Sequence, residues 1–244
     1  MNSIIFAFIV TTVAGLSTML GIIPIYIKFK DTDKIICMAL AFASGIMFSV
    51  SINSLIPESY DLLKENLNTN KVIILMILFF LIGVLLTSFI DKIFKKIDNK
   101  LYKIGIINML ALMIHNIPEG ILTFSTTTTN ISLGLTLALS IMFHNIPEGL
   151  SISIPIYYST NSRKKAVLYT AISGFSEVLG AILTYLFLFK YINNYFIGIV
   201  LSLTTGIMIY ISMFELLKNS FEYKKKRISY IFFLIGFIFM IFFK

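Results

Sequence analysis

Charged side chains are scarce in this 244-residue chain. They make up 13% of the residues, whereas a soluble domain contains about 25%. Hydrophobic residues make up 57% of the chain, and the mean hydropathy is +0.91. So few charges cannot cover the surface of a water-soluble protein of this size. The composition therefore excludes an ordinary soluble domain and indicates a chain that is embedded in lipid.

Cysteine is nearly absent too. The single Cys37 can form no disulfide within the chain and no cysteine-based zinc site. The sequence also lacks a Gly-x-x-x-x-Gly-Lys-[Ser/Thr] nucleotide loop, so ATP-driven pumping is not expected. The net charge of +8 could suit nucleic acid. Basic loops on one side of a membrane explain that charge better, so we predict no nucleic-acid partner.

Long hydrophobic runs fill almost the whole chain. About 20 apolar residues cross a bilayer as a helix, and lipid offers no partner for free backbone groups, so each span must be helical. We therefore predict an all-α polytopic membrane protein with eight transmembrane helices in a single transmembrane domain, residues 1–244. The predicted spans are 4–27, 35–57, 72–90, 104–125, 132–156, 166–189, 192–217 and 228–243.

The basic residues lie mostly on one side of these spans. Sixteen of the 20 Lys and Arg residues fall in alternate loops, which the positive-inside rule places in the cytoplasm. This distribution predicts a multi-pass protein of the cell (inner) membrane with both termini outside the cytoplasm. The sixteen are Lys28, Lys30, Lys34, Lys92, Lys95, Lys96, Lys100, Lys103, Arg163, Lys164, Lys165, Lys218, Lys224, Lys225, Lys226 and Arg227.

Four acidic residues lie well inside the predicted spans: Glu119, Glu148, Glu177 and Glu215. No Lys or Arg accompanies them there. Carboxylates within a membrane are costly and are by default candidates for a functional site. Each could instead be protonated and hydrogen-bonded, but four without a basic partner require neutralisation. Protons and metal cations are the available species.

The two histidines favour a metal cation. His115 stands four residues before Glu119, and His144 stands four residues before Glu148, so each pair shares one face of a helix. Imidazole with carboxylate suits a borderline ion such as Zn²⁺. Both pairs belong to one repeated hexapeptide, His-Asn-Ile-Pro-Glu-Gly, which lies on the fourth and fifth spans. Those spans are expected to be antiparallel neighbours, with the two motifs near the same depth.

The other residues of the hexapeptide fit a metal site as well. Asn116 and Asn145 offer neutral oxygen ligands about 100° round the helix from each histidine. Such ligands suit a second ion beside the first, with the carboxylates bridging. Each proline frees a backbone carbonyl and kinks its helix, and each glycine lets another helix or an ion approach. For one motif alone, a proline-kinked structural helix is the alternative.

Glu177 and Glu215 are less specific candidates. Glu177 follows a run of small residues that predicts tight helix packing, and Ser173 lies one turn earlier on the same face. An interhelical hydrogen bond is the alternative role for Glu177. Glu215 lies near the predicted cytoplasmic end of the seventh span, where it is either a vestibule ligand or an interfacial carboxylate.

These residues resemble the ZIP (Zrt-, Irt-like protein) family of metal transporters, and most closely its bacterial ZupT-like branch. The resemblance covers essentially the whole chain and is carried mainly by the two hexapeptides. It implies a path to the cytoplasm that includes Glu215, and a binuclear metal site. The residues of that site would be His115, Asn116, Glu119, His144, Asn145, Glu148 and Glu177.

The resemblance also implies a 3+2+3 arrangement of helices with inverted pseudo-symmetry, an elevator-type transporter, and a homodimer. The sequence departs from the family at Ser54, where similar proteins often carry Glu or His. Asn53 and Ser54 remain candidates for ligands at the entrance. The loop between the third and fourth spans lacks the histidines that are common in relatives, so the resemblance implies no metal sensing by that loop.

The predicted function is transport of divalent transition-metal ions towards the cytoplasm. Zinc is the first candidate, and iron, manganese, cobalt and cadmium also suit nitrogen and oxygen ligands. The ion is the bound substrate, and we predict no cofactor and no catalytic residue. One alternative is a membrane-embedded metalloenzyme such as an intramembrane protease, although its usual His-Glu-x-x-His motif is absent. Another is a structural protein with a static metal.

Overall fold

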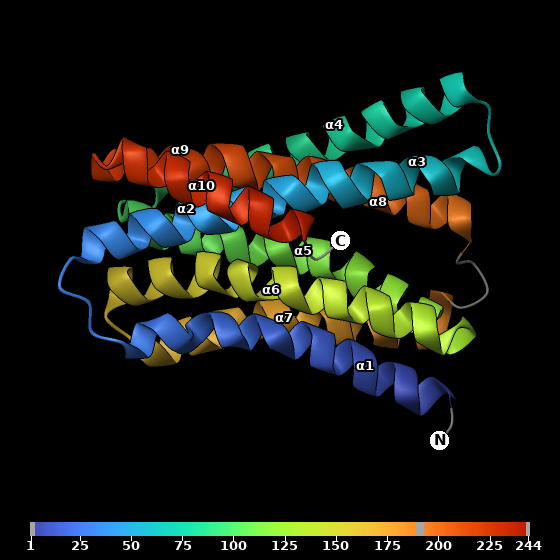
Figure 1. Ribbon diagram of the computed structural model, residues 1–244, viewed down its shortest axis with the longest axis horizontal. Helices are drawn as coiled ribbons and strands as arrows, with labels where there is room; N and C mark the ends of the chain where they lie inside the picture. Colours follow the sequence, from blue (N-terminus) through green and yellow to red (C-terminus); the bar gives the residue numbers. More distant parts are fainter. Residues whose placement is uncertain (1–2, 189–192, 243–244) are drawn as a thin grey trace.

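The computed structural model describes residues 3–188 and 193–242, and every regular element in those ranges is a helix. The all-α prediction is therefore confirmed. Neighbouring helical segments join end to end into eight rods (Figure 1). The first four rods are α1 (Ser3–Ser17) with η1 (Thr18–Tyr26), α2 (Thr32–Val50) with η2 (Ser51–Leu55) and α3 (Ile56–Lys64), α4 (Thr69–Ile93) with η3 (Phe94–Lys96), and α5 (Lys100–Thr129). The others are α6 (Ile131–Thr160), α7 (Arg163–Leu183) with η4 (Thr184–Leu188), α8 (Asn194–Tyr210) with η5 (Ile211–Leu217), α9 (Lys218–Ser220) and η6 (Phe221–Tyr223), and α10 (Lys226–Ile241).

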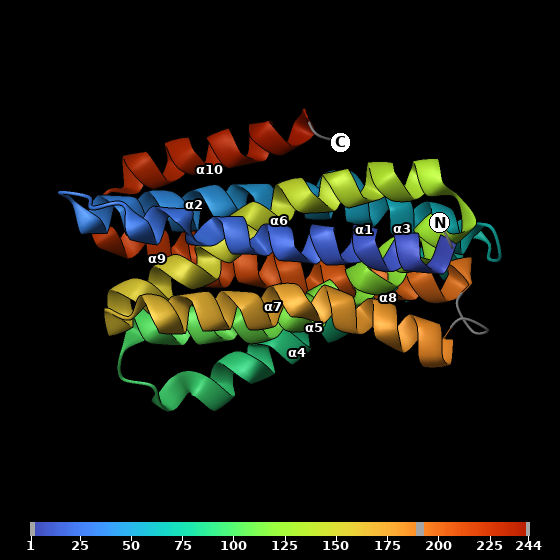
Figure 2. The ribbon, with the colours of Figure 1, turned by 90° about the horizontal axis from the view of Figure 1, so that it is seen from below.

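Six of the rods are long and apolar enough to cross a membrane, which makes the chain a multi-pass membrane protein. The other two rods are α6 and α10. The helix α6 has 30 residues, and it carries the polar hexapeptide together with a second proline, Pro155. The helix α10 has only 16 residues, and it ends near the middle of the long axis of the molecule (Figure 2).

Side-chain caps fix where most rods begin. A polar side chain accepts a hydrogen bond from the backbone N–H three residues on, which satisfies one of the free donors of the first helical turn. Asn130 ends α5 and also caps α6, so only one residue separates these two helices. The capping residues are Asp31, Asn68, Asn99, Asn130, Ser162 and Asn193.

Two predicted spans end too early. The second rod continues past Pro57 to Lys64, because the π-helical segment Ser51–Leu55 takes up the change of register at the proline. The seventh rod continues to Tyr223 through the π-helical segment Ile211–Leu217. The predicted span ends at residues 189, 192 and 243, and two of the counted lysines, Lys190 and Lys244, lie outside the described residues.

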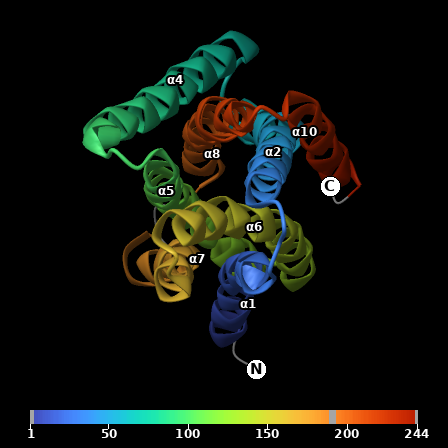
Figure 3. The same cartoon turned by 90° about the vertical axis from the view of Figure 1, so that its left-hand side faces the viewer.

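The rods form two groups, which Figure 3 shows along the long axis. The helices α2, α4, α8 and α10 lie on one side, where α2 packs on α10 and α4 packs on α8. The helices α1, α5, α6 and α7 pack together on the other side. The helix α4 is the most exposed rod and diverges from the rest of the molecule (Figure 1). The loops that carry most of the basic residues gather at one end (Figure 2).

Candidate metal centre

A cluster of two imidazoles and two carboxylates lies where α5 packs against α6. His115 and Glu119 come from α5, and His144 and Glu148 come from α6, and none of the four is more than 4% exposed. The Nε2 atom of His115 lies 3.1 Å from Glu119 Oε1 and 3.3 Å from Glu148 Oε1. Glu119 Oε1 also lies 3.0 Å from His144 Nε2. One carboxylate oxygen of Glu119 therefore faces both imidazoles.

The same cluster has the composition and spacing of a metal site. His115, His144 and Glu148 each offer a ligand atom, and these atoms lie within 4.8 Å of one another. A Zn²⁺ ion holds nitrogen and oxygen ligands at about 2.0–2.2 Å, so it needs such atoms only slightly closer together. The two imidazole rings are 6.4 Å apart between centroids, which leaves room for an ion between them.

Many buried polar atoms around the cluster have no hydrogen-bond partner among the described residues. An unsatisfied buried polar group costs about 1–3 kcal/mol, and more when it is charged. Bound cations are partners that would satisfy such oxygen atoms. These oxygens are Glu119 Oε2, Glu148 Oε2, Glu177 Oε2, Asn116 Oδ1 and Asn145 Oδ1.

The two asparagines are oriented as ligands by their own amide groups. Asn145 Nδ2 donates to the carbonyl oxygen of Ala14 at 3.0 Å and to the Glu177 carboxylate. Asn116 Nδ2 donates to the carbonyl oxygen of Ser173 at 3.2 Å. These bonds use the donors and leave both Oδ1 atoms free. They also bring Glu177 of α7 next to the residues of the hexapeptides.

The glycines of the hexapeptides let neighbouring helices come unusually close. A Cβ atom on Gly120 would lie 1.9 Å from the carbonyl oxygen of Glu177, and one on Gly149 would lie 2.0 Å from the carbonyl oxygen of Thr18. The sequence predicted that each glycine lets a helix or an ion approach, and in both cases a helix does so. Gly120 lets α7 approach α5, and Gly149 lets η1 approach α6. Both prolines lie inside helices that run on without a break.

A cavity of about 600 Å³ reaches the cluster from the end opposite the basic loops. Glu119 and His144 line its inner part, and Asn53 and Ser54 of η2 line its wall. The hydroxyl of Ser173, which the sequence placed on the same helix face as Glu177, is buried with no hydrogen-bond partner in the described chain. Glu215 lies apart from the cluster, in a second cavity of about 320 Å³ near the basic loops.

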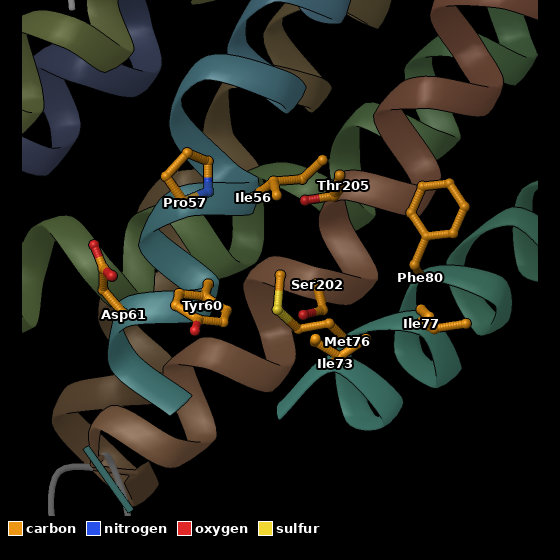
Figure 4. A pocket seen from close by; sticks show the side chains of 10 residues that line it. All are labelled: Ile56, Pro57, Tyr60, Asp61, Ile73, Met76, Ile77, Phe80, Ser202 and Thr205. Atoms are coloured by element: carbon orange, nitrogen blue, oxygen red, sulfur yellow. The ribbon is translucent and has the colours of Figure 1, made fainter. Parts of the chain in front are cut away.

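Sequence reasoning missed two acidic residues of the larger cavity, Glu58 and Asp61. They were placed beyond the second span because that span was expected to stop at Pro57. The sequence signal that could have revealed them is the presence of two acidic residues within four positions after Pro57. Asp61 also borders a separate apolar pocket of about 470 Å³ between α3, α4 and α8, and its carboxylate projects away from α4 (Figure 4). That pocket contains no histidine or glutamate.

The helical fold and the buried cluster together define a multi-pass membrane protein that handles metal cations. The family model of the ZIP zinc transporters matches residues 2–101 and 98–244. The chain therefore belongs to the ZIP family, and it is a metal-ion transporter rather than an enzyme.

Curated relatives match over nearly the full length. The zinc transporter ZupT of Streptococcus mutans is 36% identical over 238 residues, covering 91% of this chain and 90% of that protein. The zinc transporter ZupT of Oceanobacillus iheyensis is 36% identical over 249 residues, with coverage of 94% and 93%. The zinc transporter ZupT of Clostridium perfringens is 33% identical over 260 residues, with coverage of 94% and 91%.

Proposed function

We propose that this protein carries divalent transition-metal ions, zinc foremost, across the cell (inner) membrane into the cytoplasm through an intramembrane binuclear site. One observation carries the proposal: a cavity leads from one end of the molecule to buried imidazoles and carboxylates that no Lys or Arg of the described residues pairs with. Nitrogen and oxygen ligands without thiolate also suit iron, manganese, cobalt and cadmium.

The proposed ligands divide between two neighbouring ions. The first ion is held by His115 and His144 with carboxylate oxygens of the hexapeptides. The second is held by the free Oδ1 atoms of the asparagines with Glu177, whose Oε2 has no partner among the described residues. We assign the bridging role to Glu119 and Glu148, because each carboxylate has two oxygens and can bind two ions.

Transport then follows from ligand exchange. A hydrated ion in the larger cavity meets Glu119 and His144 first and replaces its water by carboxylate and imidazole. It leaves when the site opens towards Glu215. Asn53 and Ser54 serve as weak entrance ligands, and Ser173 lies beside the second ion. Binding requires neutral imidazole and ionised carboxylate, so protons compete for the same atoms.

We also propose that all eight rods of the single domain 1–244 cross the membrane in a 3+2+3 arrangement with inverted pseudo-symmetry. Close helix contacts at glycines support this arrangement. These contacts occur in pairs, and the two contacts of each pair join corresponding rods. The contact of α2 with α10 through Gly45 and Gly236 corresponds to the contact of α8 with α4 through Gly206 and Gly83. The contact of α5 with α7 through Gly120 and Gly180 corresponds to the contact of α6 with η1 through Gly149 and Gly21. The π-helical segments η2 and η5 also occupy matching rods.

The orientation we propose places both termini outside the cytoplasm. The gathering of the basic loops at one end of the molecule supports it (Figure 2). In this orientation, the larger cavity opens to the outside, as uptake requires. We further propose a homodimer, for which the exposed apolar face of α4 offers a surface.

Zinc flux into proteoliposomes tests the proposed function. The parent protein should admit zinc faster than empty liposomes, and His115→Ala and Glu148→Ala should each abolish that flux while remaining monodisperse in detergent. The exposed Lys92→Ala is the matched control and should retain flux. If the two cluster variants carry zinc as fast as the parent, the cluster is not on the path.

A further inference from the structure

The second cavity, near the basic loops, has an unusual charge arrangement. It lies between α4, α5 and the end of the seventh rod, and its volume is about 320 Å³. Two carboxylates and three ammonium groups border it. The polar residues that line it are Asp91, Lys100, Lys103, Glu215, Lys218 and Asn219.

Lys103 forms an ion pair with one of the two carboxylates, Asp91. Its Nζ atom is 2.5 Å from Asp91 Oδ1, and the two side chains are 20% and 28% exposed. The other carboxylate, Glu215, interacts electrostatically with Asp91 and with all three lysines that line the cavity. Glu215 is only 6% exposed, yet no described residue donates a hydrogen bond to its carboxylate. Lys103 therefore pairs directly with Asp91 in a cavity that also holds the buried Glu215 carboxylate.

The other two lysines of the cavity, Lys100 and Lys218, form no ion pair with Asp91 or Glu215 among the described residues. Lys100 forms an ion pair with Glu222 of η6. Lys218 is exposed and forms no ion pair with any described residue. Lys103 is thus the one charge, among the described residues that line this cavity, that is paired with Asp91.

We propose that Lys103 is a tethered counter-ion that competes with the departing metal ion for Asp91 and Glu215. This inference rests on the proposed function, because it assumes that ions leave through this cavity. A divalent transition-metal ion arriving from the central cluster displaces the ammonium group, which swings towards water. The returning ammonium group then releases the ion to the cytoplasm.

A competing ammonium group is useful at an exit because the metal ion must be bound weakly there. An ion must be attracted enough to arrive and held loosely enough to leave. Two carboxylates on one cavity would retain a divalent cation, whereas a nearby ammonium group lowers that affinity by repulsion and by direct competition. Lysine suits this role because its charge is compact and its stem is flexible. Lys103 is partly exposed already, so its route to water is short.

Zinc binding in detergent tests the proposal independently of transport. The variants are made in full-length His115→Ala protein, so that the central cluster does not mask the exit cavity. Lys103→Met should bind zinc at the exit cavity, one ion per chain. Its affinity for that ion should be about tenfold higher than the affinity of the exit cavity in the His115→Ala background. Lys103→Arg should behave like the background, since it keeps the charge, and Lys103→Met with Asp91→Asn should lose the gain.

Lys218→Met is the matched control, because it removes the same charge from the same cavity without freeing Asp91. An equal gain in zinc binding for Lys218→Met and Lys103→Met would overturn the proposal, since net charge alone would then explain it. No gain for a monodisperse Lys103→Met variant would also overturn it. Neither result depends on whether the central cluster transports metal.

Flux measurements then test the role in release. In the otherwise unchanged protein, Lys103→Met should lower the maximal zinc uptake rate about tenfold, because release becomes slow. Lys103→Arg should keep at least half of the maximal uptake rate of the parent protein. Unchanged maximal uptake by Lys103→Met would contradict a role in release, even if the cavity binds zinc.

Discussion

The substitution Gly120→Ala separates helix packing from metal ligation, because Gly120 is not itself a ligand. An added Cβ atom would meet only backbone, at 1.9 Å from the Glu177 oxygen, 2.7 Å from its carbonyl carbon and 2.8 Å from its Cα. An ordinary carbon–oxygen contact is about 3.3 Å. Since backbone atoms cannot rotate away, α5 and α7 must separate by about 1.4 Å at this point.

That separation has two separate costs. Overpacking of this kind lowers stability by about 1–3 kcal/mol. Metal sites tolerate changes of only about 0.2 Å in ligand distance, so the shift takes Glu177 away from an ion held by α5 and α6. We expect zinc affinity to fall about 100-fold, which corresponds to about 2.7 kcal/mol.

Gly45→Ala is the matched control for this experiment. Its Cβ atom would lie 2.0 Å from the carbonyl oxygen of Phe233, where α2 meets α10, away from the cluster. Both variants should show a similar fall in melting temperature, but only Gly120→Ala should lose zinc affinity in calorimetry of the detergent-solubilised protein. Parent-like zinc affinity in a destabilised Gly120→Ala variant would refute the reasoning, as would an equal loss of affinity in both variants.

Three further predictions concern the approach to the site and its ligands. Glu58→Gln should raise the zinc concentration needed for half-maximal uptake about threefold without changing the maximal rate, because Glu58 lines the outer cavity and is not a ligand of the cluster; a fall in maximal rate alone would contradict this. Asn145→Leu should lower zinc affinity about 10–100-fold, since it removes both an oxygen ligand and the donor to Glu177. Asn108→Leu is its control, because it removes the donor to the Ser151 carbonyl, two residues beyond the α6 hexapeptide, and no proposed ligand. Zinc affinity of the parent should fall as the pH is lowered, because protons compete for imidazole and carboxylate, and pH-independent affinity in calorimetry between pH values of about 5.5 and 7.5 would argue against histidine ligation.

The proximity of the histidine and glutamate side chains could be predicted from the sequence, because helix geometry is local. Residues four apart share a face wherever a helix forms, so His115 with Glu119 needed no knowledge of the rest of the fold. The short connection at Asn130 then forces α5 and α6 to be antiparallel neighbours. These two facts together bring both hexapeptides to one place.

Features that depend on packing between distant segments could not be predicted in the same way. The contact of Lys103 with Asp91 depends on how α4 meets α5, and both residues looked like ordinary residues at helix ends. The orientation of Asn145 depends on the carbonyl group of Ala14, which is remote in sequence. The helix beyond Pro57 was missed because a proline usually ends a helix, and the π-helical segment before it is not evident from residue types.

The central claim is that the two hexapeptides hold the transported ion between their imidazoles. X-ray absorption at the zinc edge, on protein loaded with one equivalent of zinc, tests this claim most directly. We expect nitrogen and oxygen ligands at about 2.0–2.2 Å with the outer-shell scattering of two imidazole rings. A zinc spectrum with no imidazole scattering would contradict it.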